Sequence, residues 1–193
     1  MQYLAFLIGI SLFMAGCRDQ EGIQTYRAPK ETTPQIPGFA SESAANKKEI
    51  DWVTPTGWIE QSASAMRVGS FLVKGKNGQS ADISVVPLSG PAGGSLSNIN
   101  RWRGQISLEP ISDDQLAANS RTVDAGGRKM LWVDFVSRDK LINKQYKLRL
   151  VAAIYTQGER TWFFKMMGED QTVQDAIPSF QRFLETLRFH EPH

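Results

Sequence analysis

Hydrophobic residues form one unbroken block near the start of the chain and shorter alternating groups from residue 50 onward. The block covers residues 3–15, carries no charge, and ends at Gly16 and Cys17. It is shorter than the roughly 20 residues that span a bilayer as a helix, and it is typical of the apolar core of an export signal. The pattern therefore predicts a signal peptide over residues 1–16.

The next segment, residues 17–49, has no helical or strand periodicity. It contains three prolines and many Ser, Thr, Gln and charged residues. Such a composition buries too little apolar surface to offset the entropy lost on ordering. We expect a flexible tether that averages roughly 30 Å from end to end as a coil. The alternative is that part of it packs on the domain as an extended arm through Ile36 and Phe39.

Alternating apolar and polar residues predict strands through most of residues 50–189. The predicted strands are 50–59 (interrupted by a turn at 55–57), 66–74, 80–86, 121–124, 128–137, 145–156 and 159–167. Asn77-Gly78 is a strong hairpin signal because both residues tolerate positive φ. Short turns join strands only in antiparallel order. In the strand 145–156, Lys147 and Arg149 indicate one exposed face at that end.

Helical spacing appears twice, and each time the apolar residues share one face. The first predicted helix follows the glycine-rich segment 90–94 with Ser95 as its N-cap, and the polar run 109–119 after it is expected to be a loop. The apolar positions are Leu96, Ile99, Trp102 and Ile106 in the first helix, and Val173, Ala176, Ile177, Phe180, Phe183, Leu184 and Leu187 in the second. Thr172 is a possible cap for the second helix, and Pro178 predicts a kink or a later start.

These elements predict one α+β domain over residues 50–189, with a frayed tail at 190–193. An antiparallel sheet of about seven strands is covered by two helices, the terminal helix lying on one face. The expected core residues are Val133, Phe135, Ile154, Trp162 and Phe164.

Composition excludes several classes of function for this chain of 193 residues. Its net charge of +2 and single cysteine give no reason to expect a nucleic-acid partner or a disulfide framework. Both histidines, His190 and His193, lie in the tail, so neither suits a catalytic triad or a metal cluster. The carboxylate pairs Asp113–Asp114 and Glu169–Asp170 are expected to lie in solvated loops and not in a catalytic cleft. We expect no enzyme, no cofactor and no metal.

Polar residues on the first helix are the candidate binding surface. They are Asn98, Asn100, Arg101, Arg103 and Gln105. Arginine forks recognise carboxylates, but these residues also fit a solvated helix face with structural hydrogen bonds. Gly93 and Gly94, at the helix start, fit either an anion site or a turn that needs positive φ. Trp102 is expected in the core.

The stretch Met14-Ala15-Gly16-Cys17 resembles the lipobox of bacterial prolipoproteins. Met14 replaces the more usual leucine, and the first residues lack the usual lysine or arginine. The resemblance implies cleavage before Cys17, a diacylglycerol on its thiol and acylation of the new amine. Arg18 stands where an aspartate retains lipoproteins in the inner membrane of one large group of bacteria. The resemblance therefore favours the periplasmic leaflet of the outer membrane.

Pro55-Thr56-Gly57-Trp58 and the order of elements over residues 50–189 resemble the PsbP/Mog1-like α/β/α sandwich. The segment AGGSLSNINRWRGQ, residues 92–105, is similar to a segment of uncharacterised bacterial lipoproteins. The first resemblance implies an accessory or binding role.

The chain is thus expected to be an envelope lipoprotein whose non-enzymatic domain binds a protein partner. The alternatives are a carrier of a small anionic ligand, held by Arg101 or Arg103 in a pocket between sheet and helix, and an enzyme of unrecognised type.

Overall fold

The computed structural model describes residues 49–64, 66–90 and 93–190, and all of them lie in the second of two units, Asn46–His193. The predicted signal peptide, Cys17 and nearly all of the predicted tether lie outside the described residues. Within the described part, no helix is both long and apolar enough to cross a membrane.

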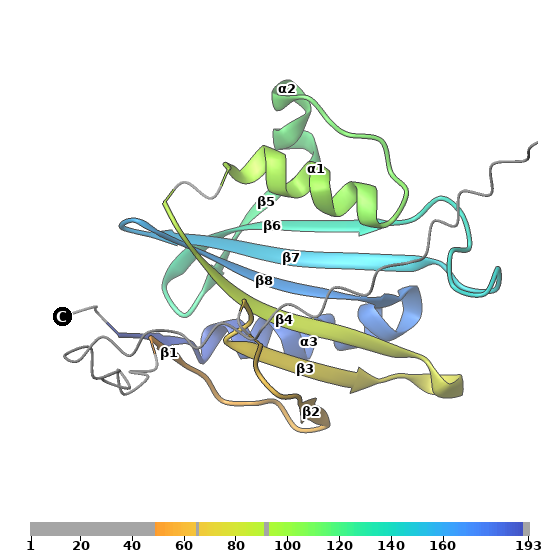
Figure 1. The fold of residues 1–193 in the computed structure, drawn as a ribbon, viewed down its shortest axis with the longest axis horizontal. Coiled ribbons are helices and arrows are strands. Elements are labelled where there is room, and N and C mark those ends of the chain that lie inside the picture. The colour runs from red at the N-terminus through yellow and green to blue at the C-terminus, as the bar shows by residue number, and fades with distance from the viewer. Residues whose placement is uncertain (1–48, 65, 91–92, 191–193) are drawn as a thin grey trace, which may run out of the picture. The chain divides into compact units, whose positions relative to one another are not determined.

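A seven-stranded antiparallel sheet forms the centre of the domain, which confirms the predicted fold class (Figure 1). Its strands are β2 (Trp58–Glu60), β3 (Gly69–Lys74), β4 (Ser80–Ser89), β5 (Arg121–Ala125), β6 (Arg128–Val136), β7 (Leu148–Gln157) and β8 (Arg160–Glu169). They lie in the order β2-β3-β4-β8-β7-β6-β5. The sheet therefore consists of two meanders joined by the pairing of β4 with β8.

A second, two-stranded sheet joins the two ends of the domain. It pairs β1 (Ile50–Asp51) with β9 (Arg188–Phe189), so residues 50–53 do not enter the main sheet. His190 was expected in a frayed tail, yet its N–H donates to the Glu49 carbonyl at 2.9 Å and its ring lies 2.7 Å from the Asp51 carboxylate. Local periodicity could not indicate this strand pairing, because the partners are 137 and 139 residues apart in the sequence.

The two main helices cover opposite faces of the sheet. α3 (Asp170–Glu185) and α1 (Ser95–Gln105) contribute to separate hydrophobic clusters. A short helix α2 (Asp113–Leu116) and a 3-10 turn, Ala117–Asn119, occupy the segment predicted as a loop, and another 3-10 turn, Lys76–Gly78, forms the Asn-Gly hairpin. α2 has the capping box Ser112/Gln115, a signal that the polar composition of the segment obscured.

The helix caps differ from the prediction at both helices. α1 begins with Gly94 as N-cap, at φ +79°, and Ser95 is its first helical residue. α3 begins with Glu169, whose carboxylate accepts from the backbone N–H of Gln171 at 3.0 Å and of Thr172 at 2.7 Å. Glu169 is therefore a buried cap and not part of a solvated loop.

Pro178 does not start α3, because the helix begins at Asp170 and continues through the proline to Glu185. Its ring is on the exposed side of the helix, while Val173, Phe180 and Phe183 are fully buried on the other side. Burial of that face on both sides of the proline outweighs the loss of one backbone hydrogen bond.

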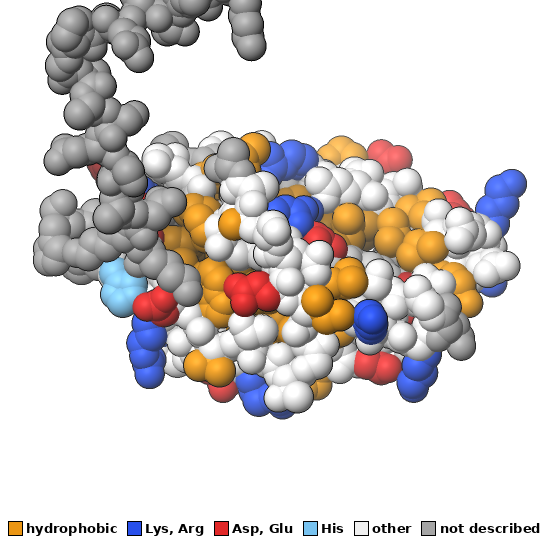
Figure 2. All heavy atoms as spheres, turned by 60° about the horizontal axis from the view of Figure 1, so that its bottom comes forward, with side chains coloured by type: hydrophobic (Ala, Val, Ile, Leu, Met, Phe, Trp, Pro, Cys, Tyr) orange, Lys and Arg blue, Asp and Glu red, His pale blue; other side chains and the backbone are white. Residues whose placement is uncertain are grey.

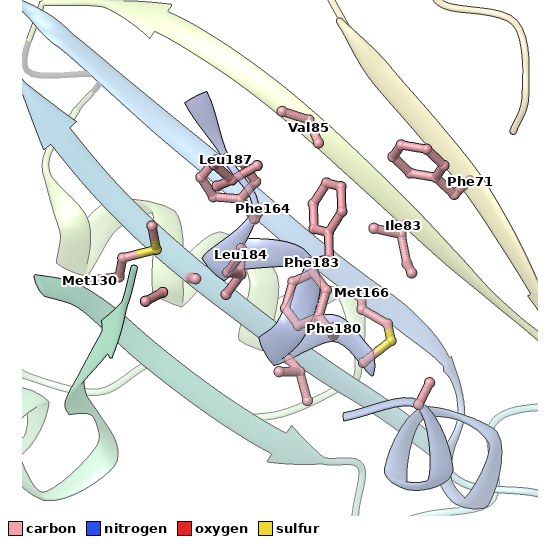
Figure 3. Packing of buried hydrophobic residues seen from close by; sticks show 14 of the residues in the cluster. Phe71, Ile83, Val85, Met130, Phe164, Met166, Phe180, Phe183, Leu184 and Leu187 are labelled. Atoms are coloured by element: carbon pink, nitrogen blue, oxygen red, sulfur yellow. The ribbon is translucent and has the colours of Figure 1, made fainter. Parts of the chain in front are cut away.

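The predicted core residues are all buried, but they belong to two clusters. Trp162 and Phe164 pack on the α3 side, where Figure 3 shows aromatic side chains of α3 directed at the sheet. Val133, Phe135 and Ile154 pack on the α1 side. The exposed face predicted at Lys147 and Arg149 is found at Lys147, which is exposed. It is wrong at Arg149, whose side chain is 17% exposed and bonds Asp134 and Asp170.

Glu169→Gln is expected to destabilise the domain by about 1 kcal/mol at pH 7, as loss of a cap does, and to flatten its acid unfolding. Burial alone would raise the pKa of Glu169, but hydrogen bonds from Thr172 and from the Gln171 N–H lower it below its ordinary value. A carboxyl with a lowered folded pKa adds stability above its unfolded pKa and loses it as the pH falls through the folded pKa.

Urea unfolding between pH 7 and pH 2 measures this effect. The difference between wild type and Glu169→Gln should shrink on the acid side, whereas Glu185→Gln, an exposed charge-matched control, should follow the wild type. A constant difference at every pH would contradict the role of the ionised carboxylate.

Candidate functional site

The two asparagines of the predicted binding surface make structural contacts. Asn98 is 4% exposed and its amide donates to the Gly94 carbonyl at 2.8 Å. Asn100 donates to the carbonyl of Ile111 at 2.9 Å and accepts from its N–H at 2.8 Å, which ties the segment after α1 back onto the helix. Asn98 and Asn100 therefore hold α1 and its exit loop in place.

Arg103 also makes contacts within the domain. Its Nε donates to the Glu109 carbonyl at 2.8 Å, and its guanidinium lies 4.8 Å from the centre of the Phe135 ring. Burial, together with the positive charge of Arg138, lowers its pKa. Gly93 and Gly94 adopt φ of +76° and +79°, the backbone conformation that favours glycine at this turn.

Arg101 and Gln105 are exposed, and Gln105 contacts a residue of another element. Gln105 accepts from the Lys165 Nζ of β8 at 3.0 Å, and Arg101 donates to Asn98 Oδ1 at 2.8 Å. These contacts place the end of α1 beside the sheet, next to strands that the sequence did not connect with this helix.

α1 covers only part of its side of the sheet. Its buried residues Ile99, Trp102 and Ile106 pack against β6, β7 and Phe163 of β8. In Figure 1, α1 lies near β5 and β6, whereas β2 and β3 form the opposite edge of the sheet. In the described part of the chain, no helix lies over the α1 side of β2, β3 and the first half of β4.

We call the uncovered surface the open face. It consists of the side chains that strand alternation and register place on the α1 side of β2, β3, β4 and β8: Ile59, Ser70, Leu72, Asp82, Ser84 and Lys165. Ser70 pairs with Ser84, and Ser84 pairs with Lys165. These three residues form a row across the strands that ends at the base of α1.

Positive charge gathers around this row. Arg67 Nη1 lies 3.0 Å from Asp82 Oδ1 and 3.3 Å from Ser70 Oγ. Lys165 is close enough to Arg67 and Arg101 for both to act on it: burial first, and then these two positive charges, lower its pKa, against the opposing effect of Asp82. Arg67 and Arg101 thus lie near Lys165, and Asp82, which pairs with Arg67, is the carboxylate that acts on this lysine. An anionic group would be attracted here.

Exposed aliphatic side chains border the same surface. Ile59 is 39%, Val68 42% and Met66 69% exposed. Figure 2, which brings the β2 and β3 side forward, shows hydrophobic side chains at the surface between charged ones. Single exposed apolar residues are common, but here they flank a charged cluster, as at many protein interfaces.

The sequence singled out Arg101 and Gln105 but missed Arg67, Asp82 and Lys165. The available signals were the polar positions 82 and 84 in an alternating strand and a lysine inside the apolar run 161–167. Neither signal shows which residues meet, because β4 and β8 are separated by 70 residues of chain.

A cavity of about 540 Å³ lies elsewhere, at the β7–β8 turn. Its floor includes Trp162 and Phe189, and Glu49 and Arg160 form an ion pair at its rim. Among the described residues, no three His, Cys, Asp or Glu side chains converge so as to hold a metal ion.

Lys165→Met is expected to raise the melting temperature by roughly 2–4 °C, corresponding to about 1 kcal/mol. Methionine keeps the packing of the stem and removes a desolvated charge that Arg67 and Arg101 repel. Because the lysine pKa is lowered on folding, its penalty is full at neutral pH and declines as the pH rises through the folded pKa. Calorimetry at pH 7 checks this, with the exposed Lys129→Met as control. An unchanged or lower melting temperature for Lys165→Met would contradict the assignment.

Comparison with known proteins finds no matching family model and no curated relative. Solved structures with a similar fold include the following three. LpqN of Mycobacterium tuberculosis, described as involved in cell envelope biogenesis, is 12% identical with a TM-score of 0.47, over 74% of this chain and 83% of that one. PsbP (CyanoP) of Synechocystis sp. PCC 6803 is 12% identical with a TM-score of 0.45, over 75% and 89%.

The third structure, a protein from Bacteroides thetaiotaomicron, is 11% identical with a TM-score of 0.44. The match covers 74% of this chain and 46% of that chain, so this chain spans less than half the length of the Bacteroides protein.

Proposed function

We propose that this chain is a lipid-anchored protein of the bacterial cell envelope, and that its globular domain is a non-enzymatic module that binds an anionic partner. The proposed address rests on the apolar residues 3–15 and on the small residues before Cys17. Cys17 carries the lipid, and residues 18–49 tether the domain to the periplasmic leaflet of the outer membrane. More than one acyl chain makes such attachment stable.

The observation that carries the binding role is the excess of cations on the open face. Arg67 and Arg101 lie near Lys165, and the carboxylate that opposes these positive charges is Asp82, which pairs with Arg67. Lys165 remains partly desolvated beside two like charges, and together these lower its pKa in spite of the opposing effect of Asp82. Charge arrangements that lower the stability of the fold are typical of binding surfaces. The bound anion supplies the missing negative charge.

The address is tested by mass spectrometry of the full chain made in a bacterium with two membranes. Wild type should lack residues 1–16 and carry acyl chains on Cys17, and it should partition into detergent. Cys17→Ala should lose the lipid and leave the membrane fraction. Retention of residues 1–16, or an unmodified thiol at Cys17, would refute the anchor.

The binding role is tested in the same cells with a photo-crosslinking residue at Ile59 on the open face, and at Gln174 on α3 as the control; both positions are exposed. A discrete adduct should form from position 59 and not from 174, and Arg101→Gln combined with Lys165→Gln should abolish it. Equal adducts from both positions, none from position 59, or one indifferent to the double substitution would refute a partner on this face.

A further inference from the structure

We propose that the partner on the open face is an acidic, extended polypeptide segment of another protein. This inference rests on the proposed function and specifies the chemistry of the partner. Carboxylates of the segment engage Arg67, Arg101 and Lys165, and its aliphatic side chains pack on Ile59 and Leu72.

The burial of Lys165 favours a polypeptide over a membrane surface. α1 packs on the sheet beside the open face, and Lys165 Nζ donates to Gln105 of α1 at 3.0 Å. Because Lys165 is only partly exposed, a single flexible chain reaches its ammonium group more readily than a planar bilayer does.

Ser70 and Ser84 stand side by side on β3 and β4, and they are 7% and 3% exposed. The longer side chains around them therefore form the surface here, among them Arg67, whose Nη1 lies 3.3 Å from Ser70 Oγ. A bound segment contacts the guanidinium of Arg67 and the ammonium of Lys165, and not the serine hydroxyls.

The spacing of the cations sets the pattern of the segment. Ser70, Ser84 and Lys165 occupy three successive strands, so the two ends of the row are roughly 10 Å apart at about 4.8 Å per strand. An extended chain advances roughly 3.3 Å per residue. Acidic side chains two to four residues apart therefore match Arg67 and Lys165. Aliphatic residues at one end reach Ile59 and Leu72, which pair at the β2 edge.

A pair of synthetic peptides tests this proposal with the full chain in nonionic detergent. One peptide has two leucines followed by three glutamates at alternate positions, and its twin has glutamine in place of each glutamate. Fluorescence anisotropy of the labelled peptides gives the affinities. We expect the glutamate peptide to bind at least tenfold more tightly than its twin, and added salt to weaken it.

Matched variants place the binding on the open face. Arg101→Gln with Lys165→Gln should lower the affinity for the glutamate peptide at least tenfold. Lys129→Gln with Lys140→Gln removes the same charge at two exposed lysines of β6 and the loop after it, and should change the affinity less than twofold. Melting temperatures of both double variants establish that they are folded.

Several results would overturn the inference. The peptides could bind equally or not at all, or inorganic phosphate could displace the glutamate peptide at equal concentration, which would assign the cations to a small anion. Vesicles of phosphatidylglycerol could bind the wild type and not Arg101→Gln/Lys165→Gln, which would assign them to a membrane. If the peptides fail while the adduct from Ile59 persists, the proposed function stands and only the acidic chemistry of the partner is refuted.

Discussion

Phe183→Ala is expected to lower the free energy of unfolding by about 3–5 kcal/mol, the range for loss of a large aromatic side chain from a core. Phe183 is fully buried in the centre of the α3 side (Figure 3). Its ring centre lies 5.2 Å from that of Trp58 and 5.5 Å from that of Phe71, with Trp52, Phe164 and Phe180 also in contact range. The total free energy of unfolding of a domain of this size is only about 5–15 kcal/mol.

The effect is large because rings from four elements and the β1–β2 segment meet at this one side chain. Its neighbours are held by their own strands and cannot collapse into the space left by alanine. Urea unfolding followed by tryptophan fluorescence measures the loss. Phe183→Leu keeps most of the apolar volume and should lose less than half as much. Equal losses from the two substitutions would show that ring contacts, and not filled volume, dominate.

Gly168→Ala is expected to destabilise the domain by about 3 kcal/mol, at the upper end for overpacking. A Cβ at Gly168 would lie 2.3 Å from the Ser80 carbonyl oxygen and 2.6 Å from the Ala81 Cα. Both are backbone atoms of β4, the strand that pairs with β8 through Ala81 and Gly168. Because no rotamer change moves a backbone atom, the two central strands have to separate locally.

Gly104→Ala is the matched control, since it adds the same methyl group to an exposed position in α1 with nothing within 4 Å. It should stabilise the domain by about 0.5–1 kcal/mol, because alanine loses less conformational freedom in a helix than glycine. In thermal unfolding, the melting temperature should fall for Gly168→Ala and rise for Gly104→Ala. A Gly168→Ala protein as stable as the wild type would mean that β4 and β8 are not in the register described.

The open face links stability to function in a way that these core substitutions do not. Lys165→Met is expected to stabilise the domain, while Arg101→Gln with Lys165→Gln is expected to weaken binding. A domain with like charges close together on its binding surface is less stable than one in which these charges are neutralised. Binding of an oppositely charged ligand offsets this loss of stability. The charges on this surface are therefore expected to lower the stability of the domain when no ligand is bound.

Local patterning determined which residues are buried and in which kind of element. The apolar spacing in α3 predicted the buried positions Val173, Phe180 and Phe183, and the alternation Ala81, Ile83 and Val85 predicted one face of β4. Such patterns report burial because side chains repeat every 3.6 residues in a helix and every two in a strand. Short turns also indicated the antiparallel order of β5 to β8.

Only the tertiary structure decided where the two halves of the sheet meet and what lies on the open face. β4 is followed by α1 in the chain but pairs with β8, and no local periodicity specifies a partner 70 or more residues away. That pairing brings Arg67, Asp82 and Lys165 together beside Arg101. Asn98 and Asn100 support α1 through hydrogen bonds to Gly94 and Ile111, which the sequence pattern did not indicate. Periodicity is a local property of the chain, whereas the convergence of charges depends on strand order.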